Sequence, residues 1–275
     1  MNLSSIKSAV TISLVPEAKG GPFVLWDGLE EGMKTAAALG YDAVEIFAPG
    51  PDAVGVEEVM ELIERYGVEI STLGTGAGWV LHGWSLTAAE EASRRHAIDF
   101  VKTIIERAAA FGASAIIGSM QGRSGNGVSR DQALDFLAIA LEELGEFAQQ
   151  HKQALIYEPL NRYETDLINS VRDGVALLNR MENKNLVLLA DLFHMNIEEA
   201  NLGDALREGG KYIGHVHFVD SNRNPAGCGH LDYGPVVEAL SDIEFNGYAA
   251  AEARPWPTPQ AAAASTIDSF KRLFR

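Results

Sequence analysis

Four side chains able to bind a metal ion stand at or near the ends of four short apolar segments in the second half of the chain. They are Glu158, Asp191, His217 and Glu252. Burial of an ionised carboxylate is costly unless a cation or hydrogen bonds compensate it. Three carboxylates and one imidazole form a hard donor set that suits Mn²⁺, Mg²⁺ or Co²⁺, in contrast to the thiolates of many zinc sites. The four residues therefore predict a divalent metal site; the alternative is four separate ion pairs in the core.

Such a site supports proton transfer next to a carbonyl group. A bound metal ion polarises a carbonyl and acidifies the neighbouring C–H bond, so that removal of the proton gives a metal-stabilised enediolate. Glu158 and Glu252, which belong to two different segments, are the expected acid–base pair and are also metal ligands. Asp191 and His217 are expected only to hold the metal. A proton returned from the opposite face inverts the carbon, whereas a proton returned to the adjacent carbon isomerises the substrate.

The segments that carry these residues belong to a repeated pattern of apolar runs and amphipathic stretches. This alternation predicts a parallel sheet with helical crossovers, and eight repeats in about 250 residues favour a (β/α)₈ TIM barrel. We expect strands at residues 9–15, 42–47, 69–75, 114–120, 154–159, 187–195, 212–220 and 248–254. An open, doubly wound sheet is the alternative, but "SLVPEAKGG" replaces the G-x-G-x-x-G motif of dinucleotide-binding folds after the first strand. Because no linker interrupts the chain, we expect one domain over residues 1–275.

A barrel would bring the four candidate ligands to one place. The carboxyl ends of all strands in a TIM barrel open on the same face, where catalytic residues lie. The four residues come from the expected strands five to eight and would project there together. The loops at residues 76–87, 118–127 and 254–259 reach the same face.

Two further titratable residues are expected near this cluster. His215 lies two residues before His217 on the same strand face, so it should sit one layer deeper, as a hydrogen-bonded residue more than as a fifth ligand. Glu45, late in the second strand, faces the barrel mouth and would reach the substrate or order a ligand, unless it is a structural ion-pair partner. Trp26, Trp79 and Trp84 would form an apolar wall or lid in the first and third loops, or pack within those loops.

Composition limits the function classes. The formal net charge is −16, and no run of basic residues appears, which excludes a polyanion such as DNA as the natural partner. The single cysteine, Cys228, rules out an intrachain disulfide and fits a reducing compartment. Apolar runs are too short for a signal peptide or a membrane span. These features predict a cytoplasmic protein with no membrane partner.

Four motifs in the second half resemble a known family. They are "EPLNRYE" (158–164), "ADLFHMNIEE" (190–199), "GHVHFVDSNR" (214–223) and "AAAEARP" (249–255). They are similar to the xylose isomerase-like sugar isomerases and epimerases, in particular to the ketose 3-epimerase branch. "TLGTGAGWVLHGWSLT", "IIGSMQGR" and "DSNRNPAGCGHLDYG" further resemble the 5-keto-L-gluconate epimerase type. The resemblance implies a barrel enzyme with one divalent metal ion, commonly Mn²⁺, that forms a dimer or tetramer and acts on a small keto-sugar or keto-sugar acid.

The resemblance also implies substrate-binding residues. Glu164, His194 and Arg223 match positions that bind the carbonyl end of the sugar in this family. Each has a structural alternative, because Glu164 and Arg223 could be solvated loop charges and His194 could cap the helix that begins "NIEE". A keto-sugar acid would need a cation for its far carboxylate, for which we choose Arg123 over Arg254.

Other activities on the same scaffold stay open. An aldose–ketose or hydroxypyruvate-type isomerase and an inosose dehydratase would share the metal and the enediolate-type chemistry. A non-catalytic sugar-binding barrel is a remote alternative, since all four ligand positions are filled. An endonuclease of abasic DNA would need a histidine-rich multi-zinc cluster and a basic surface, and a chain with seven histidines and a charge of −16 provides neither.

Overall fold

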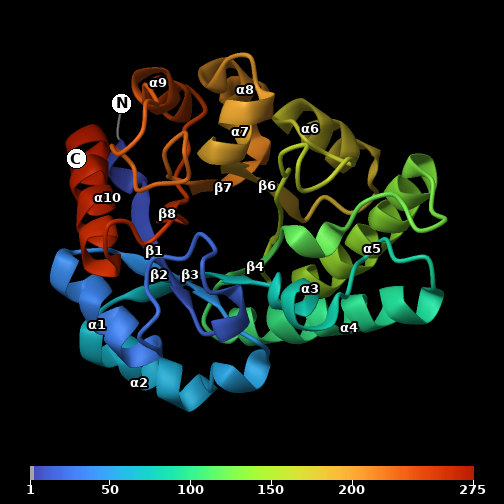
Figure 1. The fold of residues 1–275 in the computed structure, drawn as a ribbon, viewed down its shortest axis with the longest axis horizontal. Helices are drawn as coiled ribbons and strands as arrows, with labels where there is room; N and C mark the ends of the chain where they lie inside the picture. Colours follow the sequence, from blue (N-terminus) through green and yellow to red (C-terminus); the bar gives the residue numbers. More distant parts are fainter. Residues whose placement is uncertain (1–2) are drawn as a thin grey trace.

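A closed parallel barrel forms the centre of the protein. The computed structural model describes residues 3–275, and within them each strand pairs with the next along the chain while the first pairs with the last (Figure 1). The strands are β1 (Lys7–Ser13), β2 (Ala43–Phe47), β3 (Glu69–Gly74), β4 (Ser114–Ile117), β5 (Leu155–Tyr157), β6 (Leu186–Asp191), β7 (Ile213–His217) and β8 (Tyr248–Ala251). The predicted TIM barrel is confirmed, and the open doubly wound sheet is excluded.

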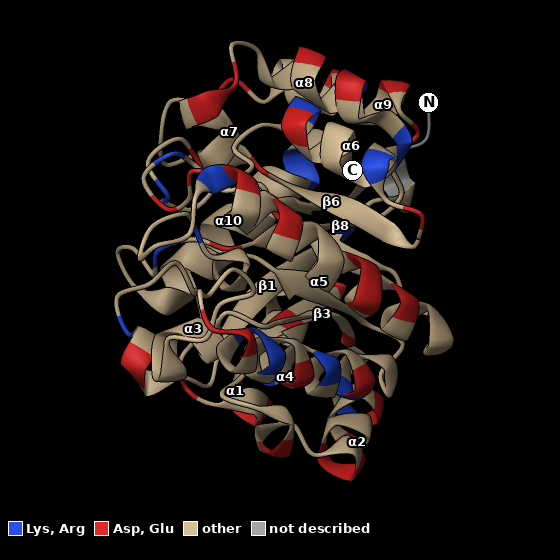
Figure 2. Cartoon of the chain, turned by 90° about the vertical axis from the view of Figure 1, so that its right-hand side faces the viewer, with Lys and Arg blue, Asp and Glu red and all other residues tan. Residues whose placement is uncertain are grey.

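Helices form a ring around the barrel (Figure 1). In the described residues they are α1 (Leu29–Leu39), α2 (Val56–Tyr66), α3 (Ala77–His82), α4 (Glu91–Ala109), α5 (Arg130–Gln150), α6 (Val171–Arg180), α7 (Leu192–Glu198), α8 (Leu202–Gly209), α9 (Gly234–Asp242) and α10 (Pro259–Phe274). Acidic and basic residues are interspersed along the helices (Figure 2). None of the helices in residues 3–275 has both the length and the apolar composition of a membrane span.

Helix α7 begins earlier than the sequence pattern indicates. The expected sixth strand over residues 187–195 is wrong at its end, because β6 stops at Asp191 and α7 follows directly. The Asp191 carboxylate accepts hydrogen bonds from the backbone N–H groups of Phe193 (2.8 Å) and His194 (3.1 Å), as an N-cap residue does. His194 therefore lies inside this helix and does not cap a helix beginning at Asn196. The apolar run Leu192–Met195 supplies buried helix residues instead of strand residues.

The interior of the barrel is packed in layers. Near the amino-terminal ends of the strands, small residues fill one layer: Ala9, Ala43 and Ala250. On the other side of the barrel, Ile116, Ile156 and Leu189 form a second cluster. Interdigitating layers of this kind make the centre of a TIM barrel a solid core. Within the described residues, the packed barrel interior opens into a cavity at the mouth.

Charged side chains at the amino-terminal end of the barrel are paired within the chain. Glu69 Oε2 lies 2.7 Å from Lys7 Nζ and accepts a hydrogen bond of the same length from the Tyr248 hydroxyl. Asp42 Oδ2 lies 2.6 Å from Arg275 Nη2 and accepts a 2.7 Å hydrogen bond from the Ser8 backbone N–H. Each of these two carboxylates thus has its own cation.

Candidate metal centre and active site

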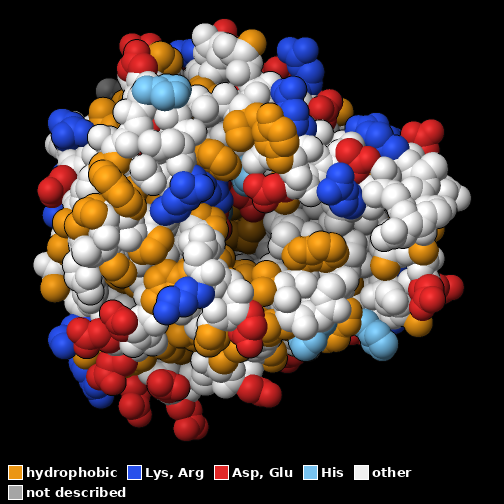
Figure 3. Space-filling model, in the orientation of Figure 1, with side chains coloured by type: hydrophobic (Ala, Val, Ile, Leu, Met, Phe, Trp, Pro, Cys, Tyr) orange, Lys and Arg blue, Asp and Glu red, His pale blue; other side chains and the backbone are white. Residues whose placement is uncertain are grey.

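A cavity of about 280 Å³ opens at the carboxyl-terminal ends of the strands. Figure 3 shows it as a hollow in the middle of this face, with acidic side chains beside it and apolar ones around it. Its volume is at the small end of the range for ligand sites, which suits a sugar-sized molecule. The expected position of the site at the barrel mouth agrees with this cavity.

The structure brings the four predicted metal ligands together. One donor atom from each of Glu158, Asp191, His217 and Glu252 lies within 4.8 Å of the others. Asp191 and His217 are 1% exposed and Glu158 is 6% exposed, whereas Glu252 is half-buried. The residues come from the ends of β6 and β7 and from the positions that directly follow β5 and β8. Consecutive strands of the barrel thus supply one compact oxygen-rich set, which fits a divalent cation.

Asp191 is held in place by its two oxygens. Oδ1 caps α7, as described above, and Oδ2 lies 2.9 Å from His217 Nδ1 and accepts a hydrogen bond from Arg223. In β6 and β7 a register shift leaves Gly214 unpaired and sets Asp191 opposite His217. The local fold therefore fixes the carboxylate before any ligand binds.

One carboxylate oxygen of Glu158 is buried without a hydrogen-bond partner in the described residues. Its Oε1 is buried and makes no hydrogen bond in the described part of the chain, although His217 Nδ1 lies 3.5 Å away and His194 Nε2 lies 3.8 Å away. Burial raises the pKa of Glu158 above its ordinary value, despite the opposing effect of His217. Gly118 makes room for the other oxygen, because a Cβ atom at this position would lie 2.5 Å from Glu158 Oε2. An orphaned buried carboxylate oxygen is the environment that a cation would complete.

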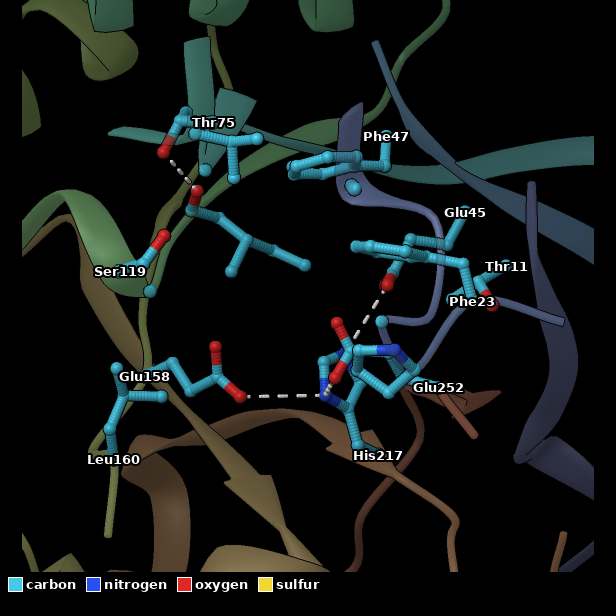
Figure 4. Close-up of a pocket in the computed structure, with 18 of the residues that line it drawn as sticks. Thr11, Phe23, Glu45, Phe47, Thr75, Ser119, Glu158, Leu160, His217 and Glu252 are labelled. Carbon is cyan, nitrogen blue, oxygen red and sulfur yellow. Dashed lines mark hydrogen bonds and ion pairs between the residues drawn. The ribbon is translucent and has the colours of Figure 1, made fainter. Parts of the chain in front are cut away.

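His217 stands between carboxylates on both sides of its ring (Figure 4). Nδ1 lies 2.9 Å from Asp191 and 3.3 Å from Glu252, and Nε2 lies 3.3 Å from Glu45. Burial alone would lower the pKa of His217, but the carboxylates of Glu252 and Glu45 raise it well above its ordinary value. The ring thus meets a concentration of negative charge that it cannot balance alone.

Arg223 is the cation that the chain itself places at the cluster. Its guanidinium donates hydrogen bonds to Asp191 and Glu252, and its side chain is buried. The backbone at Arg223 has a φ of 64°, a left-handed conformation that is uncommon for a residue with a side chain. One guanidinium faces more carboxylates than it can neutralise, so the charge balance also favours a bound cation.

The predicted substrate-binding residues divide into those that line the cavity and one that does not. Arg223, His194 and Glu164 all line the cavity. His194 is 2% exposed, and its Nδ1 lies 2.7 Å from the Asn161 side-chain nitrogen, which also donates to Glu164. Arg123 does not belong to the cavity lining; its carbonyl oxygen accepts a hydrogen bond from the Thr87 hydroxyl. The structure thus gathers the carbonyl-end candidates and leaves Arg123 outside them.

Glu45 and His215 lie directly beneath the cluster. Glu45 lines the cavity, and its Oε2 lies 3.0 Å from His215 Nε2. His215 is 1% exposed, in the deeper layer expected for it. Burial alone would raise the pKa of Glu45, but the imidazoles of His217 and His215 outweigh this effect and lower the pKa.

The cavity has an apolar wall, but other residues form it than the tryptophans considered from the sequence. Phe23 and Phe47 line the cavity, and their rings stack with centroids 4.4 Å apart. The expected tryptophans do not line it: Trp26 packs edge-on against Phe23, Trp84 stacks on His82, and Trp79 is exposed. Phe47 is the last residue of β2, and this position at the carboxyl end of a strand could have indicated that it lies at the barrel mouth. Phe23 lies in a loop and carried no such signal.

This arrangement can move protons at a substrate carbon. Glu158 and Glu252 approach the cavity from different strands and share the cluster with the two remaining ligands (Figure 4). His194, Glu164 and Arg223 add hydrogen-bonding groups at the same place. An apolar wall opposite the polar groups is suited to the C–H faces of a sugar.

Comparisons with known proteins agree with this geometry. The model of the xylose isomerase-like TIM barrel family matches residues 33–273. The chain is 26% identical over 238 residues to an L-ribulose 3-epimerase of Methylomonas sp., covering 83% of this chain and 81% of that protein. It is 28% identical over 239 residues to the 3-dehydro-D-guloside 4-epimerase of Escherichia coli, covering 83% of this chain and 88% of that protein.

Solved structures share the fold. A D-allulose 3-epimerase of Methylomonas sp., in complex with D-allulose, superposes with a TM-score of 0.82 and 21% identity, covering 98% of this chain and 97% of that one. The apo 3-keto-D-glucoside 4-epimerase of E. coli gives a TM-score of 0.80 at 23% identity, covering 97% of this chain and 99% of that one.

Proposed function

The chain belongs to the xylose isomerase-like TIM barrel family, and from this premise we propose that it is a metal-dependent sugar epimerase. The proposed substrate is a small keto-sugar, and the proposed reaction inverts a carbon next to its carbonyl group. One observation carries the proposal: the donor atoms of Glu158, Asp191, His217 and Glu252 lie within 4.8 Å of one another at the barrel mouth. Relatives that are ketose 3-epimerases and a 3-dehydro-D-guloside 4-epimerase support the same class of reaction.

The four clustered side chains would hold one divalent metal ion. Mn²⁺ is the first choice, with Co²⁺ and Mg²⁺ as alternatives, because three carboxylates and one imidazole match the preference of these ions for oxygen and nitrogen donors. The buried, unpaired Oε1 of Glu158 supports a cation at this point. When bound, the ion polarises the substrate carbonyl and acidifies the C–H bond beside it.

Glu158 and Glu252 are the proposed acid–base pair. One of these carboxylates removes the proton from the carbon next to the carbonyl, and the other returns a proton to the opposite face. Because they follow β5 and β8, they approach the substrate from separate strands, which favours inversion over transfer to the neighbouring carbon. The raised pKa of Glu158 suits a group that must both accept and release a proton.

Three residues would bind the carbonyl end of the sugar. Arg223 and His194 are buried and can donate hydrogen bonds to oxygen atoms, and Glu164 can accept one from a hydroxyl group. Asn161 links Glu164 and His194 and limits their movement. Together they would orient the substrate so that the reacting carbon faces the acid–base pair.

The far end of the substrate decides between two classes. Phe23, Phe47 and Leu160 line the cavity, and in the described part of the chain Arg223 is the lysine or arginine that lines it. This lining favours a neutral keto-sugar. The 5-keto-L-gluconate epimerase type, which the sequence motifs favour, would need a cation for the substrate carboxylate, and Arg123 is the candidate for that role.

The two classes can be separated by one variant. If the substrate is a keto-uronate, Arg123→Ala should lower kcat/KM for keto-uronates by about 100-fold, since a charged hydrogen bond is lost, and should affect tagatose and fructose far less. A wild-type preference for neutral ketoses would establish the neutral class and leave Arg123 without a catalytic role.

Proton exchange in D₂O tests the proposed reaction. The Mn²⁺-loaded protein is mixed with a panel of ketoses, keto-uronates and inososes, and deuterium at the carbon next to the carbonyl is followed by NMR. We expect incorporation with inversion at one carbon. Aldose as the only product would assign an isomerase, loss of water from inosose would assign a dehydratase, and no exchange with any compound would contradict the proposal.

A homo-oligomer is also proposed for this protein, either a dimer or a tetramer. Multi-angle light scattering measures its mass directly, and a monomer at micromolar concentration would contradict this part of the proposal.

A further inference from the structure

Glu45 is a buried carboxylate outside the four-residue cluster. It approaches His217 of the cluster on the side of Nε2. Glu45 lies in β2, is 4% exposed and contacts side chains of β3 and β7. Its Oε2 accepts a 2.6 Å hydrogen bond from the Thr72 hydroxyl and lies 3.0 Å from His215 Nε2. Its Oε1 lies 3.3 Å from His217 Nε2. Each oxygen of this carboxylate therefore has a defined direction.

Two irregularities of the sheet bring these groups into contact. A register shift between Val44 and Glu45 places Glu45 opposite Thr72 of the neighbouring strand. The shift between β6 and β7 skips Gly214 and places His217 opposite Asp191. Register shifts of this kind re-aim side chains, and they are common next to active sites. The barrel thus departs from regular pairing at the strands that align Glu45, His217 and Asp191.

The two nitrogens of His217 face different groups. Nδ1 points at Asp191, Glu252 and Glu158, whose oxygens are 2.9 to 3.5 Å away. Nε2 is buried, has no hydrogen-bond partner within the described residues, and faces the carboxylate oxygen Oε1 of Glu45 at 3.3 Å. A neutral imidazole carries one N–H group, and the partner of one nitrogen determines which nitrogen is free to bind a metal.

Glu45, His215 and His217 also offer one donor atom each within 4.8 Å, which raises the alternative of a second metal site. Glu45 Oε2 accepts the 2.6 Å hydrogen bond from Thr72 and lies 3.0 Å from His215 Nε2, whereas Oε1 faces His217 Nε2 at 3.3 Å. The Oε2 atom of Glu45 is already shared by two partners. This geometry favours a positioning role.

We infer that Glu45 is a positioning residue: it keeps the proton of His217 on Nε2 and so leaves Nδ1 free to bind the metal ion at the four-residue cluster. The inference rests on the proposed function, because it assigns a role toward the metal of that same site. His215 and Thr72 hold Glu45 in turn, so the support extends across three strands. Outer partners of metal-binding histidines commonly change metal affinity by 10- to 100-fold.

The first test replaces Glu45 by Gln and measures Mn²⁺ binding by calorimetry. We expect Glu45→Gln to bind Mn²⁺ about 10- to 100-fold more weakly than the wild type. Glu69→Gln is the matched control, because Glu69 also lies on a barrel strand but at the opposite end, and its affinity should stay unchanged. The unfolding temperature of the metal-free proteins separates loss of positioning from loss of structure.

A second readout reports the position of the proton. In protein labelled with ¹⁵N-histidine and saturated with Mg²⁺, which is diamagnetic, the nitrogen shifts of His217 should show the Nε2–H tautomer. Glu45→Gln should change this pattern. If Glu45→Gln does not fold, Thr72→Val keeps the carboxylate and removes one of its donors; it should weaken Mn²⁺ binding several-fold and shift the same signals.

The outcomes separate a failure of the proposed metal site from a failure of the role inferred for Glu45. A wild-type protein that binds no Mn²⁺ overturns the proposed metal site and the role of Glu45 with it. A wild-type protein that binds Mn²⁺, together with variants whose affinity and His217 signals are unchanged, overturns the role of Glu45 alone. Weakened binding with an altered tautomer supports it.

Discussion

The two ends of the barrel carry the same types of charged residue but differ in how these residues are paired. At the amino-terminal end, Lys7 pairs with Glu69 and Arg275 pairs with Asp42. At the mouth, Arg223 is the arginine or lysine among the described residues that lines the cavity, and it faces a group of carboxylates that includes Glu158. These pairs at the first end lie within the chain itself, whereas in the described residues the mouth gathers more carboxylates than arginine and lysine side chains, as a site for a further cation would.

The pKa values of the carboxylates reflect this difference. The hydrogen bond from Lys7 lowers the pKa of Glu69, and the partners of Asp42 outweigh its burial and lower its pKa as well. Burial raises the pKa of Glu158, which lacks such partners. The lowered pKa values of Glu69 and Asp42 and the raised pKa of Glu158 thus separate two carboxylates whose counter-charge the fold supplies from a buried one whose neighbours do not offset its burial.

Removal of the metal should have the largest effect and would test the comparison most directly. We expect chelation to abolish epimerase activity, and Mn²⁺ or Co²⁺ to restore it better than Ca²⁺, whose larger coordination shell fits four ligands poorly. Asp191→Ala and His217→Ala should lose metal and activity together, as measured by calorimetry and turnover. Full activity of the metal-free protein would contradict the prediction, and Glu69→Ala serves as the control at the opposite end.

The next largest effect should come from the acid–base pair. Glu158→Gln and Glu252→Gln keep the side-chain size and an oxygen donor but remove the ionisable group. Each should retain metal while kcat falls by about 10²-fold or more, which is the scale of a lost acid–base group. A metal-loaded variant that turns over near the wild-type rate would remove that residue from the pair.

A smaller effect is expected from crowding the Glu158 carboxylate. A Cβ atom at Gly118 would lie 2.5 Å from Glu158 Oε2, so Gly118→Ala should displace the carboxylate. Since small misplacements in an active site are costly, kcat should fall by about 10- to 100-fold with the fold intact. Gly50→Ala is the matched control, because Gly50 has extended backbone and open space around its Cβ position. Equal kcat values for the two variants would show that the carboxylate tolerates displacement.

The smallest effect should appear at the balanced end and concern stability alone. Asp42→Asn should lower the free energy of unfolding by about 0.5–1 kcal/mol near neutral pH without changing kcat. Because the folded-state pKa of Asp42 lies below its ordinary value of 3.8, its contribution is present above this pH and is lost as the pH falls through the lowered folded-state pKa. Thermal unfolding of both proteins between pH 3 and 7 measures the difference, which should shrink toward the acid end. A difference that grows in acid would contradict this assignment.

Much of the barrel could be predicted because its elements alternate regularly. β5 (Leu155–Tyr157) and β8 (Tyr248–Ala251) are runs of apolar residues, and Glu158 and Glu252 directly follow their last residues. The end of β6 was misjudged because the mainly apolar run Leu192–Met195 is compatible with either a buried strand or a buried helix. The side chain of Asp191 caps the helix and so ends the strand. Local capping geometry outweighed the apolar pattern.

Contacts between distant segments were harder to predict. Phe23 and Phe47 are 24 positions apart in the printed sequence, and their stacking depends on the path of the first loop across the mouth. The approach of Glu45 to His217 depends on register shifts that leave no trace in the pattern of apolar residues. Sequence periodicity indicates which face a side chain occupies, but a register shift of one residue lies below its precision.

The double role of Asp191 makes metal occupancy visible in the backbone. Its Oδ1 atom holds the first amide groups of α7, and its Oδ2 atom belongs to the metal cluster. If the proposed ion binds, its contact with this carboxylate would add to the hydrogen bonds that hold the cap and would slow the local opening of the helix. The exchange rates of the Phe193 and His194 amide hydrogens would then report metal binding without any substrate.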